Sequence, residues 1–192
     1  MQNDNIKLVF GAMCSGKSKY LIDLYKKEIL EKKTVEAFKP LSKNRGGDFI
    51  VSRGTDDKLP CKRVIDITEA LASKADCVII DEYQFFNSDQ LKYTLQEFKK
   101  RPWQSVYIAG LDKKDGLNYW TNYLIAEKLA DIKINLKAYC DKCGKLNATI
   151  SRLTKLGKDG SYSTTKGAEY EILCKACYEL QIKGKENGKQ IY

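Results

Sequence analysis

The chain has 192 residues, 43% of them hydrophobic, with 34 Lys and Arg against 25 Asp and Glu and no histidine. Such a length can bury one sizeable core plus a small appendage, and no apolar run approaches the roughly 18 residues that a membrane-spanning helix needs. The absence of histidine excludes every mechanism built on an imidazole base and restricts any zinc site to cysteine, with or without carboxylate.

The formal net charge of +9 favours anionic partners, and both nucleotides and nucleic acids qualify. The lysines are scattered among acidic residues, as in YKKEILEKK and KGKENGK. We therefore expect a solvated surface with a local phosphate site rather than a surface dedicated to nucleic acid. The N-terminal stretch lacks the apolar segment of a signal peptide, so we expect a cytoplasmic protein without membrane association. In that compartment its seven cysteines favour metal binding or free thiols over disulfides.

Apolar runs alternate with amphipathic stretches along most of the chain. The apolar runs predict strands at 6–10, 34–38, 77–81, 105–110 and 134–139. The amphipathic stretches predict helices over 17–33, 67–75, 87–100 and 119–130, the third opened by Asn87 with Gln90 as a capping pair. Because parallel strands need long crossover connections, this order predicts an α/β fold with a parallel sheet and flanking helices over residues 1–138.

The stretch GAMCSGKS between the first strand and the first helix fits the phosphate-loop pattern G-x-x-x-x-G-K-[ST]. Gly11 and Gly16 let successive backbone N–H groups face an anion, Lys17 offers a charge to the β and γ phosphates, and the Ser18 hydroxyl can ligate Mg²⁺. The alternative is an ordinary glycine turn. The expected nucleotide-binding residues here are Gly11, Ala12, Met13, Cys14, Ser15, Gly16, Lys17 and Ser18.

The buried run CVIIDE supplies a carboxylate at the end of a strand. In phosphate-loop enzymes an aspartate in this place reaches the Mg²⁺ shell, which makes Asp81 the candidate. If the strand stays extended, Glu82 points the opposite way and can face a substrate. An exposed charge at the strand end is the alternative for Glu82.

Two Cys-x-x-Cys pairs follow the alternating strand and helix pattern, with residues 144–173 between them. Four thiolates from Cys140, Cys143, Cys174 and Cys177 suit a closed tetrahedral zinc site, which is structural rather than catalytic. Free core cysteines or redox pairs are the alternatives. We predict a small zinc-ribbon domain over 139–180, with a long loop between the pairs, and a flexible tail over 181–192.

The stretches GAMCSGKS, IIDEYQFF, AGLD and CDKC...CKAC, in this order, resemble the zinc-containing thymidine kinases of animal cytosol, bacteria, phages and poxviruses, over about residues 6 to 178. The resemblance implies ATP, Mg²⁺ and a structural Zn²⁺, and it makes Glu82 the general base for the nucleoside 5′-hydroxyl. It places Asp81, Tyr83 and Gln84 along the nucleotide site. It also implies a homo-oligomer, either a tetramer or a dimer.

The same resemblance turns the loop between the cysteine pairs into a lasso over the nucleoside, with Arg152, Gly167 and Tyr170 among its residues. Metal loss is then expected to affect nucleoside binding and to spare ATP binding. The apolar residues expected to contact the base are Met13, Phe85, Leu111 and Trp120, for which a plain core position is the alternative.

Lys43 and Asp115 depart from the family pattern, whereas Arg45 and Arg53 match it. In KPLSKNRGG the arginine is kept as Arg45, an expected catalytic residue, whereas Lys43 stands where a carboxylate near Mg²⁺ is usual. In IVSRG, Arg53 is expected near the phosphates. Asp115 replaces a phenylalanine that usually follows AGLD, so the ATP half of the site matches the pattern better than the nucleoside half.

The leading interpretation is an ATP-dependent deoxynucleoside kinase that makes thymidine monophosphate. A nucleic-acid-stimulated ATPase is the main alternative, because helicase-type ATPases also carry an Asp-Glu strand end, but such motors need two cores and this chain has length for one. A non-catalytic nucleotide-binding regulator is a third interpretation, suggested by Lys43 and Asp115.

Overall fold

The computed structural model describes residues 4–43, 45–158, 160 and 167–187, with side chains as far as residue 182. Within it the chain forms two compact units. The first, called here the sheet unit, contains the chain up to Phe10 together with Gly16–Asp112 and Trp120–Leu136. The second, called the cysteine unit, contains Gly11–Ser15, Lys113–Tyr119 and the chain from Lys137 onward. The cysteine unit thus includes two segments that the sequence analysis assigns to the main domain.

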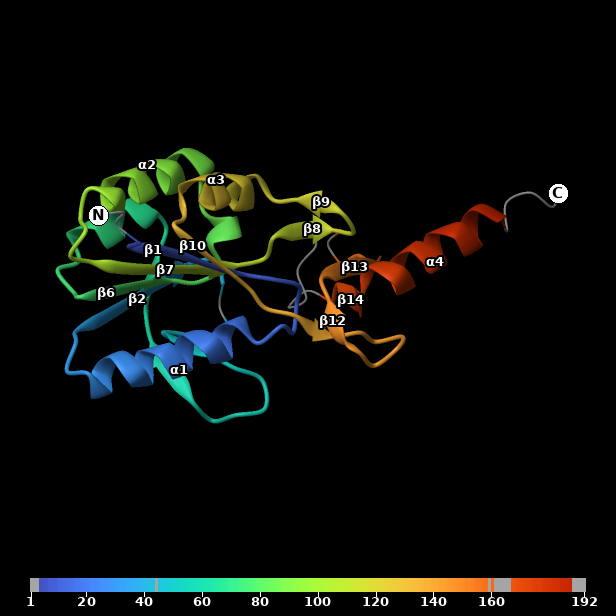
Figure 1. Cartoon of the computed structure of the whole chain (residues 1–192), viewed down its shortest axis with the longest axis horizontal. Helices are drawn as coiled ribbons and strands as arrows, with labels where there is room; N and C mark the ends of the chain where they lie inside the picture. The colour runs from blue at the N-terminus through green and yellow to red at the C-terminus, as the bar shows by residue number, and fades with distance from the viewer. Residues whose placement is uncertain (1–3, 44, 159, 161–166, 188–192) are drawn as a thin grey trace. The chain divides into compact units, whose positions relative to one another are not determined.

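The sheet unit is built on a six-stranded sheet in which every pair of neighbours is parallel. Its strand order is β10-β1-β7-β6-β2-β5 (Figure 1). The strands are β1 (Ile6–Phe10), β2 (Val35–Pro40), β5 (Lys62–Val64), β6 (Cys77–Ile80), β7 (Ser105–Gly110) and β10 (Ile132–Asn135). The α/β fold with a parallel sheet is therefore confirmed.

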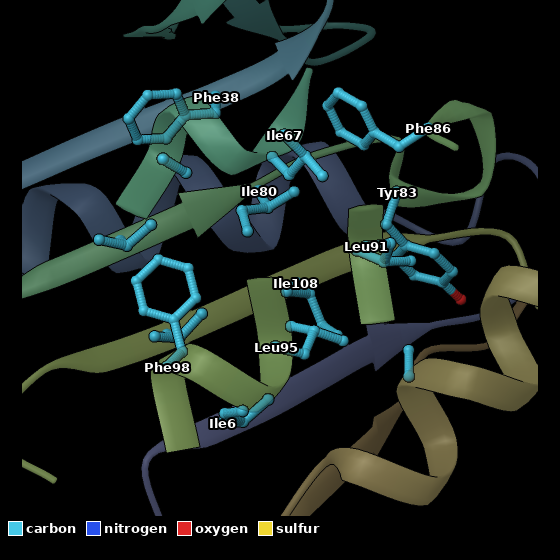
Figure 2. Packing of buried hydrophobic residues seen from close by; sticks show 14 of the residues in the cluster. Ile6, Phe38, Ile67, Ile80, Tyr83, Phe86, Leu91, Leu95, Phe98 and Ile108 are labelled. Carbon is cyan, nitrogen blue, oxygen red and sulfur yellow. The ribbon is translucent and has the colours of Figure 1, made fainter. Parts of the chain in front are cut away.

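Helices cover both faces of this sheet. Figure 1 shows α1 (Lys17–Leu30) on one face and α2 (Ser88–Lys99) with α3 (Thr121–Leu129) on the other. Along β6, Val78 and Ile80 join the core cluster under α2, while Cys77 and Ile79 join the cluster under α1. Because both faces are covered, the strand reads as a continuous apolar run. Figure 2 shows the α2 side of this core, where the side chains of that helix meet those of the strands.

Two predicted helix features differ from the structure. The stretch predicted as a helix over 67–75 is a short 3₁₀-helix, η1 (Ile67–Ala72), whose Asp66 cap accepts a hydrogen bond from the Thr68 N–H and whose Ser73 is already extended. Asn87 does cap α2, accepting from the N–H groups of Asp89 and Gln90. The Gln90 side chain instead donates to Asp66 over 2.7 Å, because η1 lies within its reach, so no reciprocal capping pair forms.

The cysteine unit consists of short antiparallel pairs and a C-terminal helix. The pairs are β8 (Lys113–Asp115) with β9 (Asn118–Tyr119), β11 (Ala138–Tyr139) with β12 (Leu146–Ala148), and β13 (Ile150–Lys155) with β14 (Glu169–Leu173). The predicted strand over 134–139 is thus divided between β10 of one unit and β11 of the other. Parts of the predicted lasso, residues 159 and 161–166, lie outside the described residues.

The predicted flexible tail over 181–192 differs from the structure where the structure describes it. Helix α4 (Lys175–Asn187) runs through residues 181–187, and residues 188–192 lie outside the described part. Residues 175–187 include three Lys and two Glu together with Ala, Leu and Gln, all of them good helix formers, and Lys175 pairs with Glu179 over 3.8 Å one turn on. No helix in the described chain has both the length and the apolar character needed to cross a membrane.

Candidate active site

The phosphate loop joins β1 to α1 through backbone conformations that favour glycine. Gly16 is left-handed, with φ 85° and ψ 14°, and caps α1 without a side-chain hydrogen bond to the first turn. The first turn of α1, which begins at Lys17, therefore presents the positive end of the helix dipole to this loop. Cys14 is also left-handed, with φ 60°. This local geometry suits a bound phosphate.

Asp81 follows directly after β6 and is buried, with 6% of its surface exposed. Burial raises its pKa from an ordinary 3.8 to about 7, and the charge of Glu82 adds to this, whereas the Glu82 N–H and the charges of Lys17 and Lys39 lower it. Lys17 and Asp81 are therefore near enough to interact electrostatically. A desolvated carboxylate beside the phosphate-loop lysine fits a Mg²⁺ site in which Asp81 and Ser18 are the candidate ligands.

Glu82 adopts a left-handed backbone conformation that the sequence does not predict. The strand ends at Ile80, and Glu82 is left-handed with φ 56° and ψ 37° at the start of η2 (Tyr83–Phe85). The expectation that Glu82 points opposite to Asp81, as successive side chains of an extended strand do, therefore does not apply. A non-glycine residue in this region costs about 1 kcal/mol or more and persists where surrounding contacts hold it. One such contact is the 2.9 Å hydrogen bond from the Glu82 N–H to the Asp81 carboxylate.

Gln84 fixes the Glu82 carboxylate against the neighbouring strand. Its Nε2 donates to Glu82 Oε2 over 2.6 Å, and its Oε1 accepts from the Leu111 N–H over 3.1 Å, directly after β7. Gln84 is buried. A Cβ on Gly110 would lie 2.2 Å from Gln84 Oε1, so only glycine leaves room for this bridge. The Tyr83 hydroxyl completes the link by donating to the Leu111 carbonyl over 3.1 Å.

Asn122 on α3 supports the same turn from the other side. Its Nδ2 donates to the carbonyl groups of Tyr83 and Phe86 over 3.0 and 2.8 Å. Its Oδ1 accepts from the Ser88 hydroxyl at the start of α2. The turn that carries Glu82 is therefore held by the Asn122 side chain of α3 as well as by the backbone of Leu111.

An aromatic pair lies beside this turn. The rings of Phe85 and Trp120 meet edge to face, with centroids 5.6 Å apart. The Lys43 ammonium lies 3.2 Å from the centre of the Phe85 ring, and burial lowers its pKa while the charge of Glu82 opposes that shift. Lys43 therefore places a cation, rather than a carboxylate, against the Phe85 face.

The two predicted arginines lie on the segment after β2. Arg45 and Arg53 are both exposed, on either side of β3 (Phe49–Val51), which pairs with β4 (Lys58–Pro60). The buried Lys39 ammonium donates to the carbonyl groups of Arg45 and Phe49 over 2.9 and 2.7 Å. Lys39 thereby fixes the backbone on which Arg45 is carried.

The four cysteines of the cysteine unit form one cluster. The Sγ atoms of Cys140, Cys143, Cys174 and Cys177 all lie within 4.8 Å of one another. Those of Cys143 and Cys174 are 3.9 Å apart. Tetrahedral zinc with Zn–S bonds of about 2.3 Å separates its sulfurs by roughly 3.8 Å, so the residues fit this metal.

The predicted lasso residues lie on or beside the β13–β14 pair. Arg152 on β13 contacts Gln181 and lies 3.6 Å from Glu171. Tyr170 is on β14 opposite Leu153, and Gly167 precedes that strand with a left-handed φ of 89°. Asp115 accepts a 2.8 Å hydrogen bond from the Leu153 N–H, so this departure from the family pattern supports β13.

Sequence reasoning missed four supporting residues: Lys39, Gly110, Asn122 and Ser151. The Gly in AGLD and the Lys in FKP were visible signals, since both lie at strand ends that carry site residues. Asn122 and Ser151 carry no local signal, because their partners are far away in the chain.

Comparison with known proteins addresses the family. The sequence profile of the family described as "Thymidine kinase" matches residues 4–178. The chain belongs to the thymidine kinase family. It is 33% identical over 190 residues to the thymidine kinase of Bacteroides thetaiotaomicron, covering 97% of this chain and 92% of that protein. It is 30% identical over 177 residues to that of Pseudothermotoga lettingae, covering 90% of this chain and 94% of that protein.

Membership of the thymidine kinase family bears on the alternatives left open by the sequence. The strand-end pair Asp81-Glu82 belongs to a kinase family rather than to a helicase-type motor. The interpretation as a nucleic-acid-stimulated ATPase is therefore not supported.

Proposed function

We propose that the chain transfers the γ-phosphoryl group of ATP to the 5′-hydroxyl of a deoxynucleoside, with thymidine as the acceptor. The observation that supports this most directly is the Glu82 carboxylate, held by Gln84 over 2.6 Å and adjacent to the buried Asp81. A thymidine kinase family member with a positioned Glu82 carboxylate, and with Asp81 near enough to the phosphate-loop Lys17 to interact electrostatically, has the groups that phosphoryl transfer to an alcohol requires.

In this mechanism Glu82 acts as general base. Its carboxylate accepts the proton of the 5′-hydroxyl as that oxygen forms a bond to the γ-phosphorus, and the bond from phosphorus to the oxygen of ADP breaks. Gln84 orients the base through its amide. Lys17 and the N–H groups at the start of α1 stabilise negative charge on the transferring group. Asp81 and Ser18 would hold Mg²⁺, which would supply positive charge against the phosphate oxygens. The exposed side chains of Arg45 and Arg53 are proposed to reach these oxygens as well.

The nucleoside half of the proposal concerns two sets of residues, which are proposed separately. We propose that Phe85, Leu111 and Trp120 contact the base and that Arg152, Gly167 and Tyr170 belong to the nucleoside-binding segment. Zinc, when bound by the four cysteines, would fix β13 and β14, which carry Arg152 and Tyr170. The interaction of Lys43 with Phe85 is a feature of this chain that an acceptor nucleoside would have to accommodate.

The test is ATP consumption by purified protein against thymidine, deoxycytidine, deoxyguanosine and no acceptor, with Mg²⁺ present. We expect turnover only with a nucleoside, fastest with thymidine. Turnover that is equal with and without nucleosides would overturn the proposal. A homo-oligomer, tetramer or dimer, and a cytoplasmic location are further parts of this proposal, which size-exclusion chromatography and cell fractionation test.

A further inference from the structure

Part of the phosphate loop belongs to the core of the cysteine unit. Ala12 is 2% exposed and packs in one apolar cluster with residues around the zinc ligands. The other buried members of that cluster are Ala138, Cys140, Ala148, Ile172, Leu173 and Cys174. Met13 is half-buried against the same cluster. The second and third residues of the phosphate loop are therefore packed as residues of this unit.

Ser151 on β13 makes a polar link to the part of the phosphate loop that belongs to this unit. Its hydroxyl oxygen accepts a 2.9 Å hydrogen bond from the Met13 N–H. Its carbonyl oxygen accepts from the Gly116 N–H, in the turn between β8 and β9, over 3.2 Å. Ser151 is 2% exposed, so the oxygen atoms that accept both bonds belong to a buried residue.

The hydrogen bond to Met13 acts on a strained turn. The Ser15 N–H approaches the Ala12 carbonyl at 3.4 Å, and Cys14 between them is left-handed, with φ 60°. Because the Met13 N–H is bonded to Ser151, the peptide group that precedes this turn has a fixed orientation. That orientation determines where the following amide groups point, and these are the groups that the phosphates of a nucleotide would meet.

We infer that Ser151 is a positioning residue for the phosphate loop. Through it the strand that carries Arg152 sets the conformation of the loop that binds ATP. The effect on catalysis rests on the proposed function. The quantity that the inference itself predicts is the affinity of the protein for a nucleotide. Loss of the Ser151 hydroxyl removes the partner of the Met13 N–H in a part-buried place and lets the loop leave its binding conformation.

The experiment compares Ser151→Ala and Ser151→Cys with wild type, because alanine removes the hydroxyl and cysteine keeps a similar volume with only a weak acceptor. Ser73→Ala is the matched control. Ser73 is also buried, at 4% exposure, and its hydroxyl accepts a hydrogen bond from the Ala75 N–H over 3.2 Å. Both residues are far from the phosphate loop in the sequence. ADP affinity is measured by titration calorimetry without nucleoside, and zinc content by metal analysis.

We expect both Ser151 variants to bind ADP roughly three- to tenfold more weakly, in line with the loss of one part-buried hydrogen bond. The Michaelis constant for ATP should rise by the same factor, with a smaller change in kcat, while zinc content and the Ser73→Ala control match wild type. ADP affinity within 1.5-fold of wild type in a folded Ser151 variant, or an equal loss in the Ser73 control, would overturn the inference. Because ADP binding needs no acceptor, a wild type that binds ADP but phosphorylates no nucleoside would refute the proposed function alone.

Discussion

The side-chain amide of Gln84 donates a 2.6 Å hydrogen bond to the carboxylate of Glu82. The other end of the same amide accepts the Leu111 N–H, so the proposed base is tied to the end of a neighbouring strand. Glu82 itself has a left-handed backbone conformation at the start of η2, beyond the end of β6. Catalysis by Glu82 should therefore depend on Gln84.

Gln84→Met tests this dependence, because methionine keeps the approximate shape and loses both hydrogen bonds. A hydrogen bond to a charged group contributes about 1.5–3 kcal/mol, so we expect kcat to fall by roughly ten- to a hundredfold with little change in the Michaelis constant for ATP. Gln104→Met is the matched control, since Gln104 is also buried and donates to the Ala75 carbonyl over 2.7 Å. Steady-state kinetics of both variants check the prediction, and equal kcat values in the two would contradict it.

Gly110→Ala tests the space that the bridge needs. The added Cβ would lie 2.2 Å from Gln84 Oε1 and 2.8 Å from the Tyr83 ring, so the turn must shift. Overpacking of this kind costs about 1–3 kcal/mol, which urea unfolding measures. In the double variant with Gln84→Ala, one of the two collisions is relieved. The destabilisation should then be less than the sum of the single effects, and strict additivity would count against this geometry.

Asp81→Asn separates stability from activity. Burial raises the pKa of Asp81 from 3.8 to about 7 in the folded protein. Between pH 3.8 and about pH 7, the carboxyl group is therefore protonated in the folded protein and ionised in the unfolded chain. Stability from this group is therefore present below the lower value and lost as the pH rises through the upper one. Without added Mg²⁺, the gain in melting temperature from Asp81→Asn should be larger at pH 8 than at pH 5, and Mg²⁺-dependent turnover should disappear. A gain that is larger at pH 5 would contradict the burial of a charged Asp81.

The sequence was informative where the relevant structure is local. The run CVII buries both faces of β6, and the phosphate loop lies between a strand and a helix as its spacing predicts. The contacts that hold the candidate base could not be predicted in this way. Gln84 meets Leu111 only because β6 and β7 are neighbours in a particular register, and Ser151 meets Met13 across 138 positions of the chain. Tertiary contacts of this kind leave no periodic pattern in either segment.

Zinc removal should weaken the binding of ADP as well as that of the nucleoside. The sequence analysis expects metal loss to spare ATP binding, but Ala12 packs in the same cluster as Cys140 and Cys174. With Cys143→Ser we expect loss of most bound zinc, and weaker binding of both nucleoside and ADP. Metal analysis and calorimetry measure these effects. The matched control is Cys61→Ser, a buried cysteine of the sheet unit, which should keep its zinc. A zinc-free variant with wild-type ADP affinity would show that the loop is independent of the cluster.

The most direct test of the kinase mechanism is the kcat of Glu82→Gln with thymidine as acceptor. Glutamine keeps the size of the side chain but cannot accept the 5′-hydroxyl proton. We expect kcat to fall by roughly 10²–10⁴, with kcat/KM falling in parallel and the Michaelis constant for thymidine little changed, because a general base contributes mainly in the transition state. A Glu82→Gln enzyme with wild-type kcat would contradict the assignment of Glu82 as the base.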